Sequence, residues 1–428
     1  MADECPVVKF SRDPSLARIE NLKQTNLRDK FGESGQTFGV FYVTCIALSI
    51  ITYVLDLALA CILLYLYYGN HCGVELALTL SFMLLSALFT TAISLRWYIV
   101  DHDDPSLGKT SSFHWIVRIV FLLLQLSPLL RYIDTLIYGI KSKIAAATGN
   151  ENQQTTLYRR MLDEDTNGAL LRLFHCFLHS APQAVIQLMI LLKSMTTQTE
   201  ANKFSTDIAV MQAWTVLAAL SSIAWSLTTY HRSVRYARDD KNKIKWAGIL
   251  VAFLWQLMSA LSRVLALSLL ASIFPAWMGC VCALHWTVMS VWLALGQSHS
   301  TACGSNRCEE LFVSIALGLA YVLAFISPTD GPTRYVYLAY YLVCFMENTA
   351  ALVVWCVTNS SSQNPALYYG AASAQVVAFL LAIAFLIVYY KCCHPSLKNR
   401  TKIPTSDSDC LQSDKPSYSK SYNVRPRS

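Results

Sequence analysis

Long apolar runs separated by short polar stretches dominate the chain from about residue 39 onward. Most runs hold roughly 20 residues with few charges, which is the length that an α-helix needs to cross the hydrocarbon core of a bilayer. The pattern therefore predicts an all-α, polytopic membrane protein. Ten segments can be delimited: 39–68, 74–100, 115–140, 169–193, 207–230, 246–272, 276–297, 309–327, 335–358 and 366–390.

Positive charges in the connecting loops indicate which of the ten segments cross the membrane. Short loops rich in Lys and Arg stay on the cytoplasmic side. The first 37 residues contain several Lys and Arg, whereas the loop at 69–73 contains none, so the chain starts inside and the first loop lies outside. If 115–140 crossed fully, the basic loop with Lys141 and Arg159 would lie outside. We therefore expect 115–140 to be a re-entrant pair of half-helices, entering and leaving on one side.

The same charge argument makes 309–327 re-entrant, because the basic tail after residue 390 then lies in the cytoplasm. The prediction is eight transmembrane helices plus two re-entrant elements, arranged as two structural repeats. A local echo between FLHSAPQAV (177–185) and FMENTAALV (345–353) supports the duplication. The expected units are a cytoplasmic arm (1–37), a first membrane repeat (38–230), a second membrane repeat (231–390) and a cytoplasmic, disordered tail (391–428).

Composition agrees with a membrane protein and argues against several other classes. Hydrophobic residues make up 54% of the chain and charged residues 14%, which leaves no room for a soluble catalytic domain. We find no phosphate-binding loop, potassium-channel filter, HExxH motif or clustered metal ligands, and no Ser or Cys nucleophile beside a base. We therefore expect neither an enzyme nor an ATP-driven pump, and no cofactor or metal. The net charge of +7 is attributed to cytoplasmic loops near anionic lipid rather than to nucleic-acid binding.

Ionisable side chains nevertheless occur inside the apolar segments. Each would cost on the order of 2.5–3.5 kcal/mol at a helix centre if it faced lipid, so we expect them to face inward, pair with one another or meet water. Buried ion pairs that only fix helix register are the alternative, and for Arg96 the side chain can extend to the interface. The set comprises Asp56, Arg96, Arg118, Arg131, Asp134, Arg172, His175, His179, Arg263, His285 and Glu347.

One helix carries a stripe of polar side chains spaced three or four residues apart, which places them on a single face about four turns long. Pro182 lies within this stripe and is expected to kink the helix and to free a carbonyl near residue 178. Such a stripe suits a solute with a polar head, which can be an ion, an amino acid or a phospholipid headgroup. The stripe consists of Arg172, His175, His179, Gln183 and Gln187.

The stretch GALLRLFHCFLHSAPQAVIQLMILL resembles the signature of the XK-related family, in which Leu-Arg-Leu leads to Phe-Leu-Glu-Ser-Ala-Pro-Gln. Further stretches agree in order over about residues 40–390, including YVLDLALACILLYLYYG, LLRYIDTLIYGIKSK and YLAYYLVCFMENTAALVVW. The resemblance implies the same fold of eight spans and two re-entrant elements. It also implies an ATP-independent phospholipid scramblase that exposes phosphatidylserine at the plasma membrane, in apoptosis. The alternative is a small-solute transporter or an accessory membrane subunit without scrambling activity.

Scramblase activity would give the intramembrane charges a role, since a lipid headgroup can pass from one charged side chain to the next along them. The family normally has Glu where this chain has His179, so the polarity of the path is altered here, or His179 only packs and hydrogen-bonds. We also expect phospholipids, and either an accessory membrane subunit or a second copy, as partners, with both termini cytoplasmic. The residues expected in the lipid path or its gate are Asp56, Arg131, Asp134, Arg172, His179, Gln183, Gln187, Arg263 and Glu347.

Cytoplasmic segments offer candidate sites of regulation. The family resemblance implies caspase cleavage, for which Asp165 and Asp409 are the candidates, although the tail has no Asp-x-x-Asp and phosphorylation is an alternative. Cys392 and Cys393 follow the last span directly and are candidates for palmitoylation. The closely spaced pair Cys303 and Cys308 can bridge or bind metal, whereas most other cysteines lie in apolar runs and are expected to pack as hydrophobes.

Overall fold

The computed structural model describes residues 38–103, 112–123, 126–196, 206–237, 243–296, 307–326, 334–358 and 365–393. Eight helices within these ranges are long and apolar enough to cross a membrane, as predicted. The third span is one continuous helix, formed by α6 (Glu151–His175), the π-helical turn η1 (Cys176–Ser180) and α7 (Ala181–Thr196). The last span is α13 (Pro365–Val388) followed by the π-helical turn η3 (Tyr389–Cys393). The other six spans, in chain order, are α2 (Val40–Gly69), α3 (Gly73–Asp103), α8 (Thr206–Tyr236), α9 (Trp246–Ile273), α10 (Pro275–Gly296) and α12 (Arg334–Thr358).

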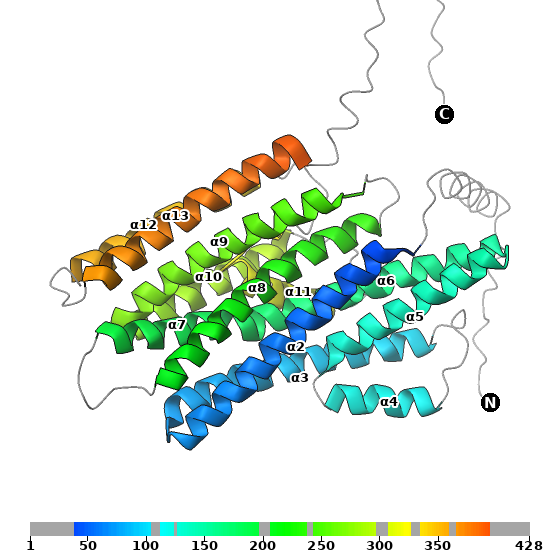
Figure 1. The fold of residues 1–428 in the computed structure, drawn as a ribbon, viewed down its shortest axis with the longest axis horizontal. Helices are drawn as coiled ribbons and strands as arrows, with labels where there is room; N and C mark the ends of the chain where they lie inside the picture. The colour runs from blue at the N-terminus through cyan, green and yellow to red at the C-terminus, as the bar shows by residue number, and fades with distance from the viewer. Residues whose placement is uncertain are drawn as a thin grey trace, which may run out of the picture.

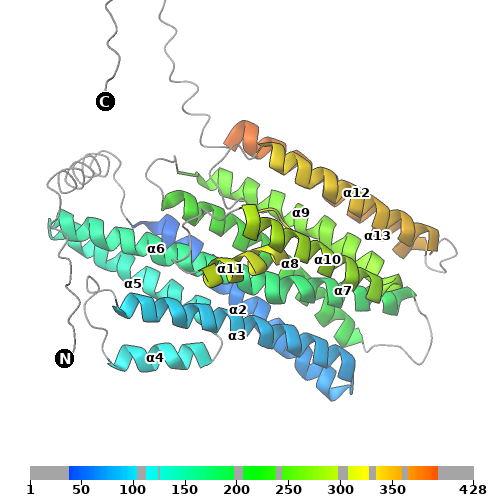
Figure 2. The ribbon, with the colours of Figure 1, turned by 180° about the vertical axis from the view of Figure 1, so that it is seen from behind.

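The two segments that the charge pattern assigned as re-entrant lack the features of a spanning helix. Segment 115–140 forms two helices, α4 (Ser112–Leu123) and α5 (Ser127–Ala147), and Pro128 lies in the first turn of α5. Figures 1 and 2 show the chain turning back between α4 and α5, with the end of α3 drawn between them. Segment 309–327 begins as the short helix α11 (Arg307–Ala320) and continues as turns and irregular backbone to residue 326. A helix of 14 residues is too short to cross about 30 Å of hydrocarbon.

One expectation about the first half is wrong. The stretch between the re-entrant segment and residue 169 was expected to be a polar loop, but α5 extends to Ala147 and α6 starts at Glu151. Asn150 caps α6 by accepting a hydrogen bond from the backbone N–H of Gln153 (3.2 Å). The two helices pack against each other as a long hairpin, with Tyr158, Met161 and Leu162 of α6 in one hydrophobic cluster with Leu136 and Tyr138 of α5. This tertiary packing stabilises a helix that hydropathy alone does not indicate.

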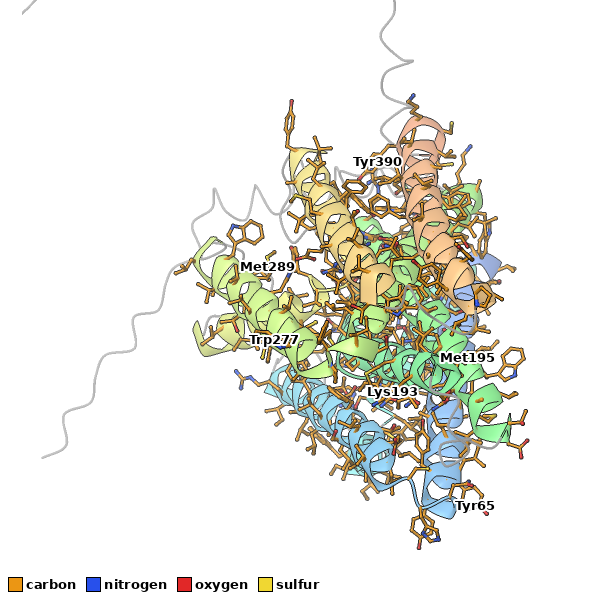
Figure 3. All side chains as sticks on the ribbon, turned by 90° about the vertical axis from the view of Figure 1, so that its left-hand side faces the viewer. Tyr65, Lys193, Met195, Trp277, Met289 and Tyr390 are labelled. Carbon is orange, nitrogen blue, oxygen red and sulfur yellow. The ribbon has the colours of Figure 1, made fainter. Side chains whose placement is uncertain are left out.

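The helices differ in how much of their surface the protein itself covers. The α6–α7 helix and α8 lie at the centre, with 67% and 61% of their spanning windows buried, whereas α10 and α13 lie at the edge with 11% and 17%. Figure 1 shows α8 and α9 between the N-terminal helices and the α12–α13 pair. The outer helices expose large apolar side chains, and Figure 3 shows Tyr65 projecting from the end of α2. In a bilayer these apolar surfaces contact acyl chains, and terminal aromatic rings suit the interface.

Pro182 affects the backbone of the central helix one turn before its own position. Proline has no N–H, so the carbonyl four residues earlier loses its usual helical partner. The structure accommodates this with the π-helical turn η1, in which the N–H of Ala181 donates to the carbonyl of Cys176. The helix therefore continues through a single wide turn. This turn contains His179 and Ser180, so it aims two polar side chains from the middle of the helix.

Candidate functional site

The predicted stripe lies in the protein interior, where all five of its residues are at most 5% exposed. We refer to Arg172, His175, His179, Gln183 and Gln187 as the polar column. At its first position, Arg172 donates to the backbone carbonyl of Ser49 and to the hydroxyl of Thr52 (2.9 Å), both on α2. It also donates to the hydroxyl of Ser222 on α8 (3.0 Å). Neutral oxygens from two helices thus bind this buried cation.

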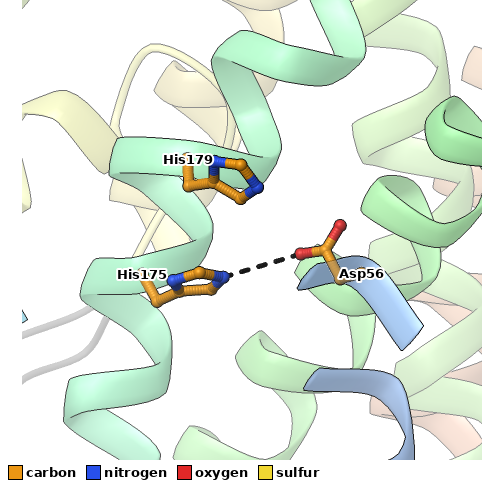
Figure 4. Close-up of side chains that lie close together, drawn as sticks. All are labelled: Asp56, His175 and His179. Carbon is orange, nitrogen blue, oxygen red and sulfur yellow. Dashed lines mark ion pairs between the residues drawn. The ribbon is translucent and has the colours of Figure 1, made fainter. Parts of the chain in front are cut away.

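The middle of the column contacts a buried carboxylate. Ser180 donates a hydrogen bond to Asp56 Oδ2 (2.5 Å), and the same oxygen lies 3.7 Å from His175 Nε2. Figure 4 shows His175 and His179 one above the other on the central helix, on the side that faces Asp56 of α2. His175 Nδ1 forms a hydrogen bond with the hydroxyl of Ser86 on α3 (3.1 Å). The carboxylate thus joins α2 to the central helix, and α3 supports the contact through the bond from Ser86 to His175.

The far end of the column is a hydrogen-bonded amide network. Gln183 donates to the carbonyl of Thr79 (3.1 Å), and Gln187 donates to the hydroxyl of Thr79 (3.1 Å) and to the amide oxygen of Gln183 (2.9 Å). Tyr67 donates to Gln187 (2.5 Å) and accepts from Gln212 (2.8 Å). The column is thus bonded to α2, α3 and α8 along its length, and its polar atoms do not face lipid.

A second polar site lies in the other half of the chain. Arg263 on α9 forms an ion pair with Glu347 on α12, donates to the amide oxygen of Asn348 (3.1 Å), and donates to the carbonyl of Val322 (2.8 Å) in the irregular segment after α11. His285 on α10 lies 3.4 Å from the other carboxylate oxygen of Glu347. The Glu347 side chain is 32% exposed and that of Arg263 is 6% exposed. We refer to Arg263, Glu347 and His285 as the open pair site.

The residues predicted on the first re-entrant segment have partners that the sequence did not indicate. Arg131 forms an ion pair with Glu164 on α6 (2.8 Å), and its guanidinium lies over the ring of Tyr98, 3.7 Å from the ring centroid. Tyr98 donates to Asp134 (3.0 Å). Arg131 and Asp134 were both predicted to lie in the lipid path or its gate. Tyr98 contacts both of them, and Glu164 of the neighbouring helix α6 supplies a carboxylate to Arg131.

Asp165 is buried in the middle of α6, where both of its carboxylate oxygens accept from Arg232 on α8 (2.9 and 2.8 Å). A protease needs an exposed, extended segment, so this arrangement disfavours the predicted cleavage after Asp165. The residue is better explained as the anion of a buried ion pair between α6 and α8. Sequence reasoning placed Asp165 in a loop and therefore missed Arg232 as its partner.

The remaining candidate sites are the cysteines and the tail aspartate predicted for modification or cleavage, and the structure describes only some of them. Cys392 is exposed and Cys393 half-buried at the end of η3, which leaves palmitoylation of both as a prediction. Asp409 and Cys303 lie outside the described residues, and Cys308 lies at the start of α11, where its side chain is not described. The proposed bridge between the two cysteines and the cleavage after Asp409 thus remain predictions.

The expectation that metal ligands do not cluster is wrong. Asp56, His175 and His179 are all buried, and each can contribute one ligand atom such that the three atoms lie within 4.8 Å of one another. The spacing of four residues between the two histidines is a signal visible in the sequence, since it places both rings on one helix face. The carboxylate comes from a helix more than 100 residues earlier, and only the fold brings it to the histidines.

The described chain is an all-α, multi-pass membrane protein. It combines eight helices that can span a membrane with two shorter helical segments, and charged side chains are buried in its interior. The chain belongs to the XK-related family, since the family model described as XK-related protein matches residues 44–395. It is 28% identical over 320 residues to XK-related protein 8 of Tetraodon nigroviridis, covering 74% of each chain. It is 27% identical over 334 residues to cell death abnormality protein 8 of Caenorhabditis elegans, covering 75% of this chain and 71% of that relative.

Proposed function

We propose that this protein is an ATP-independent phospholipid scramblase of the plasma membrane, which exposes phosphatidylserine during apoptosis. Membership of the XK-related family and a relative named for abnormal cell death support this assignment. The observation that carries it is the partly exposed ion pair of Arg263 and Glu347 on spanning helices. A charged group facing hydrocarbon is costly, so an ion pair held partly open inside a membrane needs a polar ligand or water as its neighbour.

The chemistry of the open pair site suits a phospholipid headgroup. Arg263 offers a planar guanidinium, which binds phosphate oxygens well, and Glu347 offers a carboxylate for an ammonium group. A zwitterionic headgroup can therefore replace each partner of the pair in turn while its acyl chains remain in lipid. The exposed carboxylate supplies the first contact, and the buried Arg263 supplies the second. This sequence lowers the cost of moving a charged headgroup through the hydrocarbon layer.

The polar column is proposed as the gate or as a further part of the path. Its side chains are buried and mutually bonded in the structure, so a headgroup can reach them only after α2, α3 or α8 separates from the central helix. We therefore assign the structure to a resting arrangement. Both termini are proposed to be cytoplasmic, on the basis of their Lys and Arg residues, and the repeats are proposed as 38–230 and 231–390.

Reconstitution tests the proposal. Purified full-length protein is placed in liposomes that contain a fluorescent lipid in both leaflets, and dithionite is added to bleach the outer leaflet. We expect bleaching to pass well beyond the half that is accessible in protein-free vesicles. A chain ended after Cys393 is measured in parallel, because the tail is the proposed site of regulation. Bleaching that stops at the protein-free level for both chains would refute scrambling by the protein alone.

The same vesicles distinguish the alternative function. A small-solute transporter would move an ion or amino acid across vesicles without accelerating dithionite bleaching. An accessory membrane subunit would show neither activity until it is co-reconstituted with its partner chain. A second copy of this chain is the other proposed partner, and cross-linking in the vesicles detects it.

A further inference from the structure

We propose that Asp56, His175 and His179 form a binding site for a divalent transition-metal ion of the zinc type. The ligand set is one carboxylate and two imidazoles, which is a common donor set for Zn²⁺. The site joins α2 to the central helix at the π-helical turn η1. It is a binding site in its own right, and the inference does not rest on scrambling activity.

His179 provides the first argument. Its side chain is 1% exposed, and no described residue forms a hydrogen bond with either of its ring nitrogens. A buried polar group without a partner destabilises a protein, so an imidazole in this position favours binding of a ligand. Figure 4 shows that the ring lies beside His175 on the side facing Asp56, with the two ring centroids 5.1 Å apart. A metal ion between the three side chains would bind one of these nitrogens.

His175 provides the second argument. Its Nδ1 is held by the hydroxyl of Ser86, and Nε2 points at Asp56 and has no hydrogen-bond partner among the residues that the structure describes. Zinc-bound histidines commonly have their other nitrogen held by an oxygen in this way, because that contact fixes the ring and its tautomer. The distance from Nε2 to Asp56 Oδ2 is 3.7 Å. Two ligands of a tetrahedral zinc ion are about 3.3 Å apart for bonds of about 2.0–2.1 Å, so a small movement closes the site.

Charge provides the third argument. Asp56 is 1% exposed, and Arg172, the nearest arginine along the central helix, donates to Ser49, Thr52 and Ser222. Among the described residues, the carboxylate accepts a hydrogen bond from Ser180 and lies beside the two histidines, while Arg172 acts on it from farther away. A buried carboxylate needs a cation, and a metal ion provides one without requiring the imidazoles to be charged. The three side chains leave a fourth coordination position for water or for another oxygen.

Metal analysis of the full-length protein tests the site. The chain is purified with a tag that lacks histidine, incubated with Zn²⁺, desalted, and analysed for zinc by mass spectrometry. We expect about one zinc per chain. In parallel, Co²⁺ should give the visible absorption of a tetrahedral site without the strong near-ultraviolet band of thiolate ligation. Wild-type protein that retains no stoichiometric zinc and gives no tetrahedral Co²⁺ spectrum would overturn the proposal, as would a thiolate spectrum.

Two variants and a matched control locate the ion. His175→Gln and His179→Gln are each expected to weaken zinc binding at least about tenfold, since each removes one of three ligands. His231→Gln is the control, because one ring nitrogen of His231 also has no hydrogen-bond partner in the described part of the chain, but His231 lies outside the cluster, on α8. Its zinc content should equal that of the wild type. Equal zinc in all four proteins would overturn the assignment. Should a His variant fail to elute as a monodisperse protein, the wild-type Co²⁺ spectrum still decides.

Discussion

The two halves of the chain handle intramembrane charge differently. In the first half, the polar column is enclosed by α2, α3 and α8, and Arg172 is fully buried among neutral oxygens. In the second half, Arg263 is buried but its partner Glu347 is about one-third exposed. Both arrangements give a buried arginine polar partners, and of these two described sites the second presents a partly exposed carboxylate to a molecule outside the bundle.

The difference follows from what covers each site. The central helix α6–α7 packs against neighbours over most of its spanning window, whereas α10 and α12 are mostly uncovered. The same kind of residue is therefore held rigidly in one half and is accessible in the other. We infer that the enclosed residues maintain the fold or gate the path, and that the open pair site contacts lipid first. The predictions below test this division.

Loss of an enclosed charge should have the largest effect on stability. Asp165→Ala leaves Arg232 buried without a carboxylate, and removal of one partner of a buried pair costs about 3–5 kcal/mol. We expect a large drop in the thermal unfolding midpoint of the detergent-solubilised protein. The double variant Asp165→Leu with Arg232→Met should recover much of the loss, since apolar residues of similar size remove both charges. An unchanged midpoint for Asp165→Ala would show that the pair is dispensable.

Substitutions in the open pair site should slow lipid movement strongly and should destabilise the protein less than the loss of Asp165 does. Arg263→Gln leaves a carboxylate that is already part exposed, and the new amide can still donate to one of the former partners of Arg263, so we expect a smaller destabilisation than for Asp165→Ala. The scrambling rate should fall at least tenfold in reconstituted vesicles. If stability falls as much as it does for Asp165→Ala, the open pair site is structural as well.

Hydrogen bonds at the far end of the column should have an intermediate to small effect on stability. Tyr67 bridges Gln187 and Gln212, so Tyr67→Phe removes two hydrogen bonds and should cost about 1–2 kcal/mol. The measurement is again the unfolding midpoint. Tyr65→Phe is the matched control, because Tyr65 lies on the same helix but is 75% exposed. A midpoint for Tyr67→Phe equal to that of Tyr65→Phe would contradict the proposed network.

The smallest effect is expected at the end of the last helix. Cys392 is exposed, so Cys392→Ser should change the unfolding midpoint within experimental scatter. Chemical exchange of thioester-linked acyl groups in cell membranes tests the predicted palmitoylation, with Cys61→Ser, an exposed cysteine in the middle of α2, as control. Labelling that persists after both Cys392 and Cys393 are replaced would place the acyl group elsewhere.

The sequence predicted the number of spans because helix length and loop charge are local properties. It also predicted that Arg172, Gln183 and Gln187 share one buried face, since helical spacing alone places them there. It did not predict their partners, because hydrogen bonds to Ser49 or Thr79 depend on how distant helices pack.

Helices outside the apolar runs were harder to predict. The segment from Glu151 to residue 168 is rich in polar side chains, and its helix is stabilised by packing against α5 and by the Asp165–Arg232 pair. Neither cause is visible in a hydropathy pattern. The cluster around Asp56 was missed for the same reason, since its members are joined by tertiary structure and not by spacing alone.

The most direct test of the central claim compares Glu347→Gln with wild type in the dithionite assay, at matched protein-to-lipid ratio and with unfolding midpoints measured on the same preparations. The substitution keeps the size of the side chain and removes its charge at the exposed end of the open pair site. We predict a scrambling rate at least tenfold lower, with a smaller drop in the midpoint than Asp165→Ala causes, because the amide oxygen of the new glutamine can still accept from Arg263. An unchanged rate, or a rate that falls only in proportion to the folded fraction, would contradict a lipid path through this site.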